Sequence, residues 1–156
     1  METRFQITEA ELSLEDALSF LCRPGWGAQS FFTGTVRTPN KGKDVEYLEY
    51  EAYGPMCVRV LEGLALEASE KWRTGPEGAV LSETALGGVY VAHRTGRLYP
   101  AEMSLIVGVG SPHRRAALKA CDYLIERIKL ALPVWKLEHT SDGEEWVEGS
   151  LSVQAL

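Results

Sequence analysis

The run from Ser111 to Glu138, SPHRRAALKACDYLIERIKLALPVWKLE, constrains the fold more than any other part of the chain. Its apolar residues recur at helical spacing, and the pattern ends at a proline followed by VWKLE. We therefore expect one amphipathic helix from Pro112 to about Leu132, with Ser111 as its cap, and then a strand. The apolar run MSLIVGVGS (103–111) directly before it predicts a fully buried strand.

The charges at the two ends of this helix are unusual. His113, Arg114 and Arg115 place cationic side chains where the helix dipole is already positive. A helix that needed only stability would more often carry Asp or Glu there, whereas free backbone N–H groups beside cations form an anion site. The other end supplies Lys129 and, seven residues later, Lys136. The segment therefore predicts an anionic ligand.

Helix length limits how these charges can cooperate. His113 and Lys129 lie sixteen positions apart, which is about 24 Å at 1.5 Å per residue. They cannot both contact one small ligand within one chain. Either there are two sites, or two chains bring opposite helix ends together, and the second arrangement predicts a homodimer with composite sites.

Each lysine also has a simpler interpretation. A cation in the last helical turn complements the dipole, which would explain Lys129 without a function. Lys136, between Trp135 and Leu137, either extends its ammonium to solvent or lines a pocket. Two neighbouring lysines lower each other's pKa, which would help one of them act as a base, an acid or a nucleophile.

Two further cations lie at predicted strand ends. Arg37 follows Gly34, where a bulge or a close backbone approach is expected, and borders a polar loop, TPNKGKD. An arginine on an exposed face is the alternative reading. His93 precedes Arg94 in VAHR, and a structural, hydrogen-bonding histidine is the favoured interpretation there.

Composition narrows the possible partners. The 156 residues are 45% hydrophobic and 24% charged, which suits one globular domain spanning 1–156. The net charge of −6 argues against nucleic acid as a partner. The segment 111–138 has the opposite sign, with six Lys/Arg and three Asp/Glu. The opening METRFQITEA has no signal region, and no apolar run is long enough for a membrane span. We expect a cytoplasmic protein without a membrane partner.

Cys22, Cys57 and Cys121 are odd in number, widely spaced and set among apolar residues. No CxxC or metal-ligand spacing is present, so small core side chains in a reducing compartment are expected, with no disulfide framework, metal or cofactor. No phosphate loop, dinucleotide fingerprint or Ser/His/Asp pattern is present either. A cysteine-based sulfurtransferase through Cys57 or Cys121 is disfavoured, because neither lies in a cationic loop-to-helix context.

The remaining elements follow from period and turn signals, and together they predict a fold class. Ser13 and Asp16 open a short helix that ends near Cys22, and Pro55 starts a second long helix. The strands 28–37 and 45–53 are expected to pair as a long hairpin, TGRLYPAE to be a connection, and Asp142-Gly143 to be a turn. The other predicted strands are RFQITEA (4–10), a weaker AVLSETAL (79–86), VYVAHR (89–94) and VWKLEHT (134–140). The expected class is α+β, one domain with a mainly antiparallel sheet, two longer helices and one short helix.

Several motifs occur in a recognisable order and spacing. They are FFTGTVR, LEYEAYGPM, VAHRTGRL, GVGSPHR, IKLALPVWKLE and WVE, with an EA…KW stretch in the second helix. Over residues 25 to 148 the chain resembles the large, catalytic subunit family of molybdopterin synthase. The resemblance implies an α/β-hammerhead type of fold and a sulfurtransferase.

In that family, sulfur arrives as a thiocarboxylate on the C-terminal Gly-Gly of a small ubiquitin-like subunit. It is transferred to cyclic pyranopterin monophosphate to form the dithiolene of molybdopterin. The resemblance implies a homodimer at the centre of a heterotetramer, with no metal or cofactor. The alternative is a non-catalytic anion-binding scaffold subunit that docks a partner's tail.

The resemblance also implies roles for particular residues. Lys129 and Lys136 would be catalytic, and both would bind substrate. The remaining substrate-binding residues would be Thr35, Val36, Arg37, His113, Arg114, Leu137 and Glu138. Some family members carry arginine two residues after WVE, where this chain has Ser150, so a contribution of the C-terminal segment to the pocket is not implied.

Overall fold

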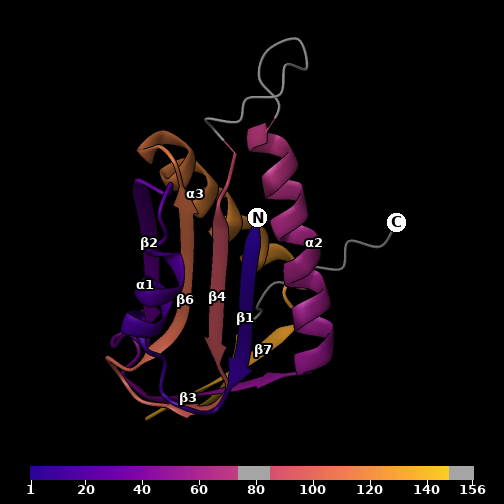
Figure 1. Ribbon diagram of the computed structural model, residues 1–156. Helices are drawn as coiled ribbons and strands as arrows, with labels where there is room; N and C mark the ends of the chain where they lie inside the picture. Colours follow the sequence, from indigo (N-terminus) through magenta and orange to yellow (C-terminus); the bar gives the residue numbers. More distant parts are fainter. Residues whose placement is uncertain (74–84, 148–156) are drawn as a thin grey trace.

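The larger of two sheets has the strand order β1-β4-β6-β2 in the computed structural model, which describes residues 1–73 and 85–147 (Figure 1). β1 runs parallel to β4, whereas β4–β6 and β6–β2 are antiparallel. The apolar run of the central strand β6 is buried along nearly its whole length, as its sequence predicted. The bounds are β1 Glu2–Thr8, β2 Ala28–Thr35, β4 Gly88–Arg94 and β6 Met103–Ser111.

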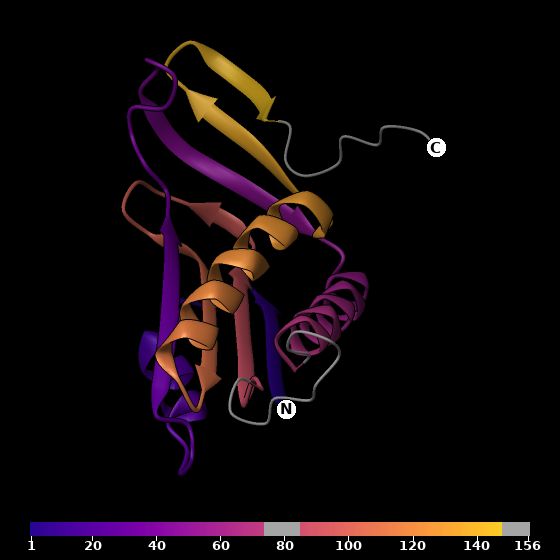
Figure 2. The same ribbon diagram turned by 90° about the horizontal axis from the view of Figure 1, so that it is seen from above.

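Helices cover both faces of this sheet, which explains why β4 and β6 have no polar face. α2 (Gly54–Arg73) and α3 (Arg114–Ala131) enclose the main core with Val89 and Val91 of β4. The short α1 (Leu14–Leu21) packs on the opposite face, against the intervening Tyr90. Figure 2 shows α2 and α3 side by side on one face, with α1 beyond the sheet.

The starts of two helices test the sequence predictions. At α1 the predicted cap is confirmed, since Ser13 Oγ accepts a hydrogen bond of 3.1 Å from the backbone N–H of Asp16. At α3 the prediction was wrong. Ser111 is the last residue of β6, where it pairs with Ala28 and is fully buried, so the strand uses the residue expected to cap the helix. The helix begins at Arg114, with His113 as an N-cap that makes no side-chain capping bond.

The smaller sheet has the order β5-β3-β7-β8 and is antiparallel throughout. Figure 1 shows β3 and β7 crossing below the ends of the larger sheet's strands. Its own small core contains four buried side chains, Val36, Val45, Leu48 and Leu98. The bounds are β3 Val45–Ala52, β5 Gly96–Leu98, β7 Val134–Thr140 and β8 Gly143–Val147.

The predicted hairpin between residues 28–37 and 45–53 is wrong. β2 pairs with β6, and β3 pairs with β5 and β7, so the segment between β2 and β3 crosses from one sheet to the other. Pairing between neighbours along the chain is only a tendency. Here β6 is apolar on both faces and needs a second strand at its open edge, which β2 supplies. The bulge expected at Gly34 is confirmed by a register shift between Gly34 and Thr35.

Other differences are smaller. The first strand is Glu2–Thr8 rather than 4–10, and part of the expected TGRLYPAE connection forms β5. A regular strand would place Val45 and Leu48 on opposite faces of β3. A register shift between Val45 and Tyr47 instead brings both side chains into one core. Most of the weaker AVLSETAL strand lies outside the described residues. The α+β class with two longer helices and one short helix is confirmed, and none of the described helices is long and apolar enough to cross a membrane.

Candidate active site

Two adjoining hollows lie between the two sheets, near the C-terminal end of α3. We call the first, of about 280 Å³, the lysine pocket, and the second, of about 150 Å³, the Arg37 pocket. Tyr50 and Lys136 line both, so the two hollows meet at this pair. The lysine pocket is lined by Phe32, Gly34, Tyr50, His93, Ser104, Leu105, Ile128, Lys129, Leu132, Val134 and Lys136. The Arg37 pocket is lined by Thr35, Val36, Arg37, Asn40, Leu48, Tyr50, Lys136 and Glu138.

Strand alternation decides which residues of β7 reach these pockets. Lys136 and Glu138 point to the pocket side, and Lys136 lies directly opposite Tyr50 of β3. Leu137 points to the other side, where it pairs with Glu49 and with Trp146 of β8. Of the three predicted site residues in β7, Leu137 is therefore the one that lines neither hollow.

Lys136 is the most perturbed cation of the site. Burial lowers the pKa of its ammonium below 10.5, and the positive charges of Lys41 and Arg37 lower it further, while Glu138 opposes the shift. The sequence predicts Lys129 as the neighbouring cation that lowers this pKa. The structure instead attributes the lowered pKa to burial and to two cations from the segment that crosses between the sheets. Lys136 consequently gives up its proton more readily than an exposed lysine.

Lys129 lies at the mouth of the lysine pocket, in the last turn of α3. Its side chain is 61% exposed, and its Nζ is 3.5 Å from Glu126 Oε1, one helical turn earlier. An exposed pair of this kind constrains the side chain weakly. The ammonium is therefore free to turn toward a ligand in the pocket.

Arg37 is connected to Glu138 through Asn40. Arg37 donates to Asn40 Oδ1 at 3.1 Å, and Asn40 Nδ2 donates to Glu138 Oε2 at 2.9 Å. The polar loop expected around Asn40 forms a tight turn in which Asn40 and Lys43 exchange backbone hydrogen bonds, with Lys41 and Gly42 at positive φ. This turn fixes the position of Asn40, which the sequence analysis did not select.

Thr35 and Val36 follow the bulge at Gly34 and form one wall of the Arg37 pocket. The N–H of Val36 donates to the carbonyl of Glu102 at 2.9 Å, and the Val36 carbonyl accepts from Ala101 at 2.7 Å. The Val36 side chain is buried in the small core. The segment therefore has a fixed backbone, and it aligns Arg37 with the pocket.

His113 and Arg114 lie at the opposite end of α3 from Lys129. Both are exposed, and neither lines the two pockets. The structure thus brings Thr35, Val36, Arg37, Lys129, Lys136 and Glu138 together within one chain, and it leaves His113 and Arg114 apart, as the helix length required.

Three further pocket residues were not predicted as site residues: Tyr50 and Ser104 were not singled out, and His93 was assigned a structural, hydrogen-bonding role. Tyr50, His93 and Ser104 come from three different strands, so only the arrangement of the sheets brings them together. The His93 ring contacts Tyr50 edge-on, with centroids 5.2 Å apart. Ser104 Oγ donates to the carbonyl of Gly34 and lies within hydrogen-bonding reach of the Tyr50 hydroxyl. For His93 and Ser104 the available signal was a polar residue in an otherwise apolar strand, whereas Tyr50 lies in a strand rich in acidic residues and gave no such signal.

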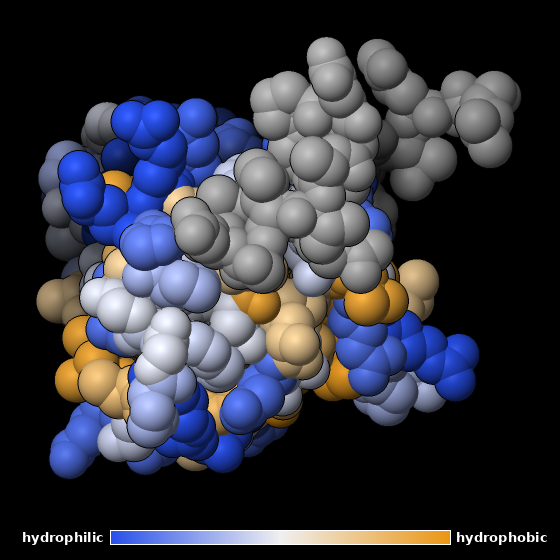
Figure 3. All heavy atoms as spheres, turned by 45° about the horizontal axis from the view of Figure 1, so that its top comes forward, coloured by the Kyte–Doolittle hydropathy of each residue, from blue (hydrophilic) through white to orange (hydrophobic). Residues whose placement is uncertain are grey.

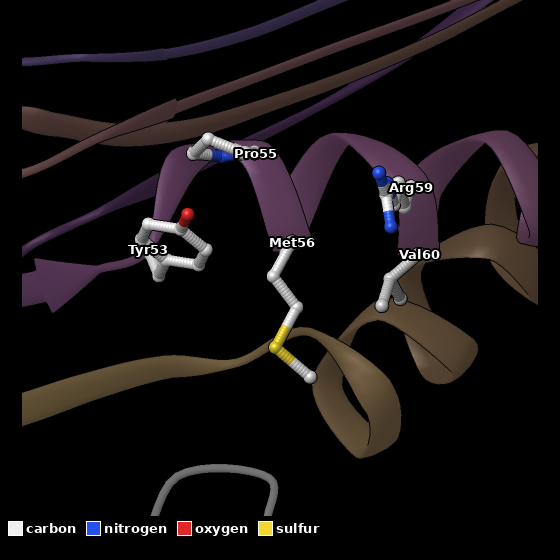
Figure 4. Close-up of a pocket in the computed structure, with 5 residues that line it drawn as sticks. All are labelled: Tyr53, Pro55, Met56, Arg59 and Val60. Carbon is white, nitrogen blue, oxygen red and sulfur yellow. The ribbon is translucent and has the colours of Figure 1, made fainter.

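Another hollow, of about 560 Å³, lies at the start of α2 and is lined by Tyr53, Pro55, Met56, Arg59 and Val60 (Figure 4). Met56 and Val60 point the same way from successive turns of α2. The titratable side chains that line this hollow are Tyr53 and Arg59. It is an open surface, since Tyr53 is 64% and Met56 52% exposed. The face in Figure 3 is largely hydrophilic, with hydrophobic residues in small separate groups. The lysine and Arg37 pockets bring two lysines, an arginine, a histidine and a glutamate together at adjoining walls, and we place the candidate site there.

The cysteines lie outside both pockets. Cys57 and Cys121 are buried, and burial raises the pKa of each thiol, which keeps it protonated and unreactive at neutral pH. Cys22 is exposed, so the prediction of a core side chain is wrong for this residue, and all three cysteines are free. In the described part of the chain, no group of three or more His, Cys, Asp or Glu residues could hold a metal ion.

Fold and site together define a small α+β protein with a cationic hollow between two sheets. The family model described as MoaE protein matches residues 7–131. The molybdopterin synthase catalytic subunit of Bacillus subtilis is 40% identical over 152 residues, covering 97% of this chain and 89% of the relative. The chain belongs to the MoaE family.

Solved structures agree with this assignment. The molybdopterin synthase structure from Staphylococcus aureus matches with a TM-score of 0.79 at 37% identity, covering 92% of this chain and 96% of the other. A MoaE protein from Burkholderia ambifaria matches with a TM-score of 0.74 at 31% identity, covering 99% and 93%.

Proposed function

We propose that this chain is the catalytic subunit of a molybdopterin synthase. It transfers sulfur from the thiocarboxylated C-terminal Gly-Gly of a small ubiquitin-like subunit to cyclic pyranopterin monophosphate, and so forms the dithiolene of molybdopterin. The names of its relatives, its family and its fold support this function.

The observation that carries the proposal is the meeting of Lys129, Lys136 and Arg37 around two adjoining hollows. Cations at the wall of a partly buried cavity suit a phosphorylated substrate and an incoming thiocarboxylate. The buried thiols lie outside this site, which suits a reaction whose sulfur is delivered by a partner.

The family resemblance and the positions of the residues support one role for each. Lys129, at the mouth, assists attack on the pterin carbon or holds the acyl group of the small subunit. Lys136, with its lowered pKa, orients the reactants and exchanges a proton. Arg37, aligned by Asn40, binds phosphate or pterin. Thr35, Val36 and Glu138 complete the wall.

His113 and Arg114 need a second chain in this proposal. They lie too far from Lys129 to reach the same ligand, so a homodimer would present the start of α3 from one chain to the pockets of the other. Two small subunits would complete a heterotetramer. A cytoplasmic location, expected from the sequence, belongs to the same proposal.

The test is reconstitution of the chain with thiocarboxylated small subunit and cyclic pyranopterin monophosphate, assayed for the dithiolene product. Product that depends on both components supports the catalytic function. Tight binding of the small subunit without product would indicate the scaffold alternative.

A further inference from the structure

His93 is a buried imidazole in the wall of the lysine pocket. It is the penultimate residue of β4, where it pairs with Leu105 of β6 and Ile7 of β1. Its side chain comes from the larger sheet, contacts the Tyr50 ring edge-on, and lines the same hollow as Lys136 of the smaller sheet. The residue is 8% exposed.

Its tautomer is fixed by one hydrogen bond. Nδ1 lies 2.8 Å from the backbone carbonyl oxygen of Arg94. A carbonyl oxygen only accepts, so Nδ1 carries the proton and donates it. In the neutral ring this leaves Nε2 as an acceptor with a free lone pair.

Nε2 has no hydrogen-bond partner within residues 1–73 and 85–147. It is also not fully enclosed, because the one unpartnered, fully enclosed side-chain atom in that part of the chain is Arg127 Nε. The hollow that His93 lines is the lysine pocket, which is therefore the space available to this nitrogen.

The surroundings keep this imidazole neutral. Burial lowers the pKa of His93 below 6.5, and the hydrogen bond to Arg94 opposes the shift only in part. The titratable groups that share the pocket are Lys129, Lys136 and Tyr50. Two of them are cations, and burial raises the pKa of Tyr50, so its phenol is neutral. No charge lining this pocket favours an imidazolium.

The proposed reaction requires a group of this kind. When a thiocarboxylate sulfur attacks a substrate carbon, the product is a thioester that joins the carrier to the substrate through that sulfur. Water must then cleave the acyl carbon–sulfur bond, or the sulfur stays attached to the carrier. A lysine held as an ammonium can stabilise the oxyanion of that step, whereas the proton of the water needs a neutral acceptor, which the free Nε2 of His93 supplies.

We propose that His93 Nε2 is the general base of this hydrolysis, a proposal that rests on the proposed function. Water oxygen bonds to the acyl carbon as its proton passes to Nε2. The carbon–sulfur bond then breaks, sulfur leaves on the pterin as a thiolate, and the carrier is released as a carboxylic acid that loses the second proton of the water to solvent and regains its C-terminal carboxylate. The proton on Nε2 passes to the thiolate or to solvent, and no atom is oxidised or reduced.

The test uses His93→Asn in the reconstituted complex. The asparagine amide can still donate to the Arg94 carbonyl, as Nδ1 does, but it has no basic nitrogen. His139→Asn is the matched control, because His139 is equally buried and lies on the other face of β7. Single-turnover reactions are quenched in acid, and the covalent carrier–pterin adduct and the free product are measured by mass spectrometry.

We expect His93→Asn to form the adduct at the wild-type rate and to hydrolyse it about 10²–10⁴-fold more slowly, so that the adduct accumulates. Wild-type hydrolysis should slow as the pH falls through the pKa of His93, and the variant should lack that dependence. His139→Asn should behave as wild type.

Hydrolysis by His93→Asn at the wild-type rate would overturn the role of His93 while leaving the proposed function intact. A wild-type complex that forms neither adduct nor product would overturn both. If His93→Asn melts well below wild type, His93→Gln provides a second variant without a basic nitrogen, and the same two rates decide the outcome.

Discussion

Tyr50 of β3 and Lys136 of β7 are directly opposite each other in an antiparallel pair, and both line the lysine pocket and the Arg37 pocket. Their side chains share one face, so the phenol ring lies beside the lysine stem where the two hollows meet. The Tyr50 ring is in turn held by His93 and Ser104 of the larger sheet. This pair therefore joins the two sheets at the candidate site.

Lys136→Met should change how stability depends on pH. The unfolded lysine has a pKa near 10.5, and burial lowers it in the folded protein. Below the folded pKa, Lys136 is protonated in both states, and the buried ammonium lowers the free energy of unfolding by its full amount. Between the two pKa values the unfolded chain binds more protons than the folded one, so the free energy of unfolding rises with pH. The wild-type melting temperature minus that of Lys136→Met should therefore increase from neutral pH toward 10.5. A difference that stays constant would contradict the assigned burial.

Lys129→Ala should lower the rate of dithiolene formation by about 10²-fold or more, because it removes the ammonium at the pocket mouth. The small subunit should still bind, as measured by calorimetry, because the loss of one exposed side chain should leave the folded chain intact. Lys119→Ala, an exposed lysine on the same helix that lines neither pocket, is the control. Unchanged turnover in Lys129→Ala would remove this residue from the mechanism.

Mixing two inactive chains tests the composite site. If Arg114 serves the pocket of a neighbouring chain, a dimer of one Arg114→Ala chain and one Lys129→Ala chain contains one intact pocket. Random exchange of subunits should then restore roughly a quarter of wild-type activity. Activity of the mixture would be measured against each variant alone, and an absence of rescue would place the complete site in one chain.

Replacing Cys22, Cys57 and Cys121 together with alanine should leave turnover largely intact. The two buried thiols pack in the core with raised pKa values, and neither lines a pocket. The change should reduce stability, since alanine is smaller and leaves small cavities. Thermal denaturation would show that the variant folds, and a folded variant without activity would revive a thiol-based mechanism.

Local patterns predicted the elements well. The Ser13 cap, the apolar β6 and the bulge at Gly34 follow from side-chain chemistry within a few residues, and all three are confirmed. Sheet pairing could not be predicted in the same way, because the residue pattern of β2 or β3 identifies a strand but does not say which other strand it pairs with. The error at Ser111 has the same origin, since one residue suits both the end of a strand and the cap of a helix.

The residues of the candidate site also differ in whether the sequence alone could indicate them. Lys129, Lys136 and Arg37 stand out because a charge in an apolar or dipolar setting is visible in the sequence. Tyr50 and Ser104 do not, and His93 suggested only a structural role, because their common pocket exists only once two sheets cross. Leu137 was included with its neighbours in VWKLE, although strand alternation turns it away from both hollows.

Asn40→Ala should weaken substrate binding more than it slows chemistry. The Asn40 amide donates to Glu138 and accepts from Arg37, so its loss frees the guanidinium and leaves a buried carboxylate without its donor. Because Arg37 is proposed to bind phosphate or pterin, KM for the cyclic pterin should rise several-fold, with a smaller change in kcat. Asn40→Asp should be worse, since it retains the acceptor for Arg37 but places a second carboxylate against Glu138. Steady-state kinetics of both variants would check this, and an unchanged KM in Asn40→Asp would show that the Arg37–Asn40–Glu138 connection has no part in binding.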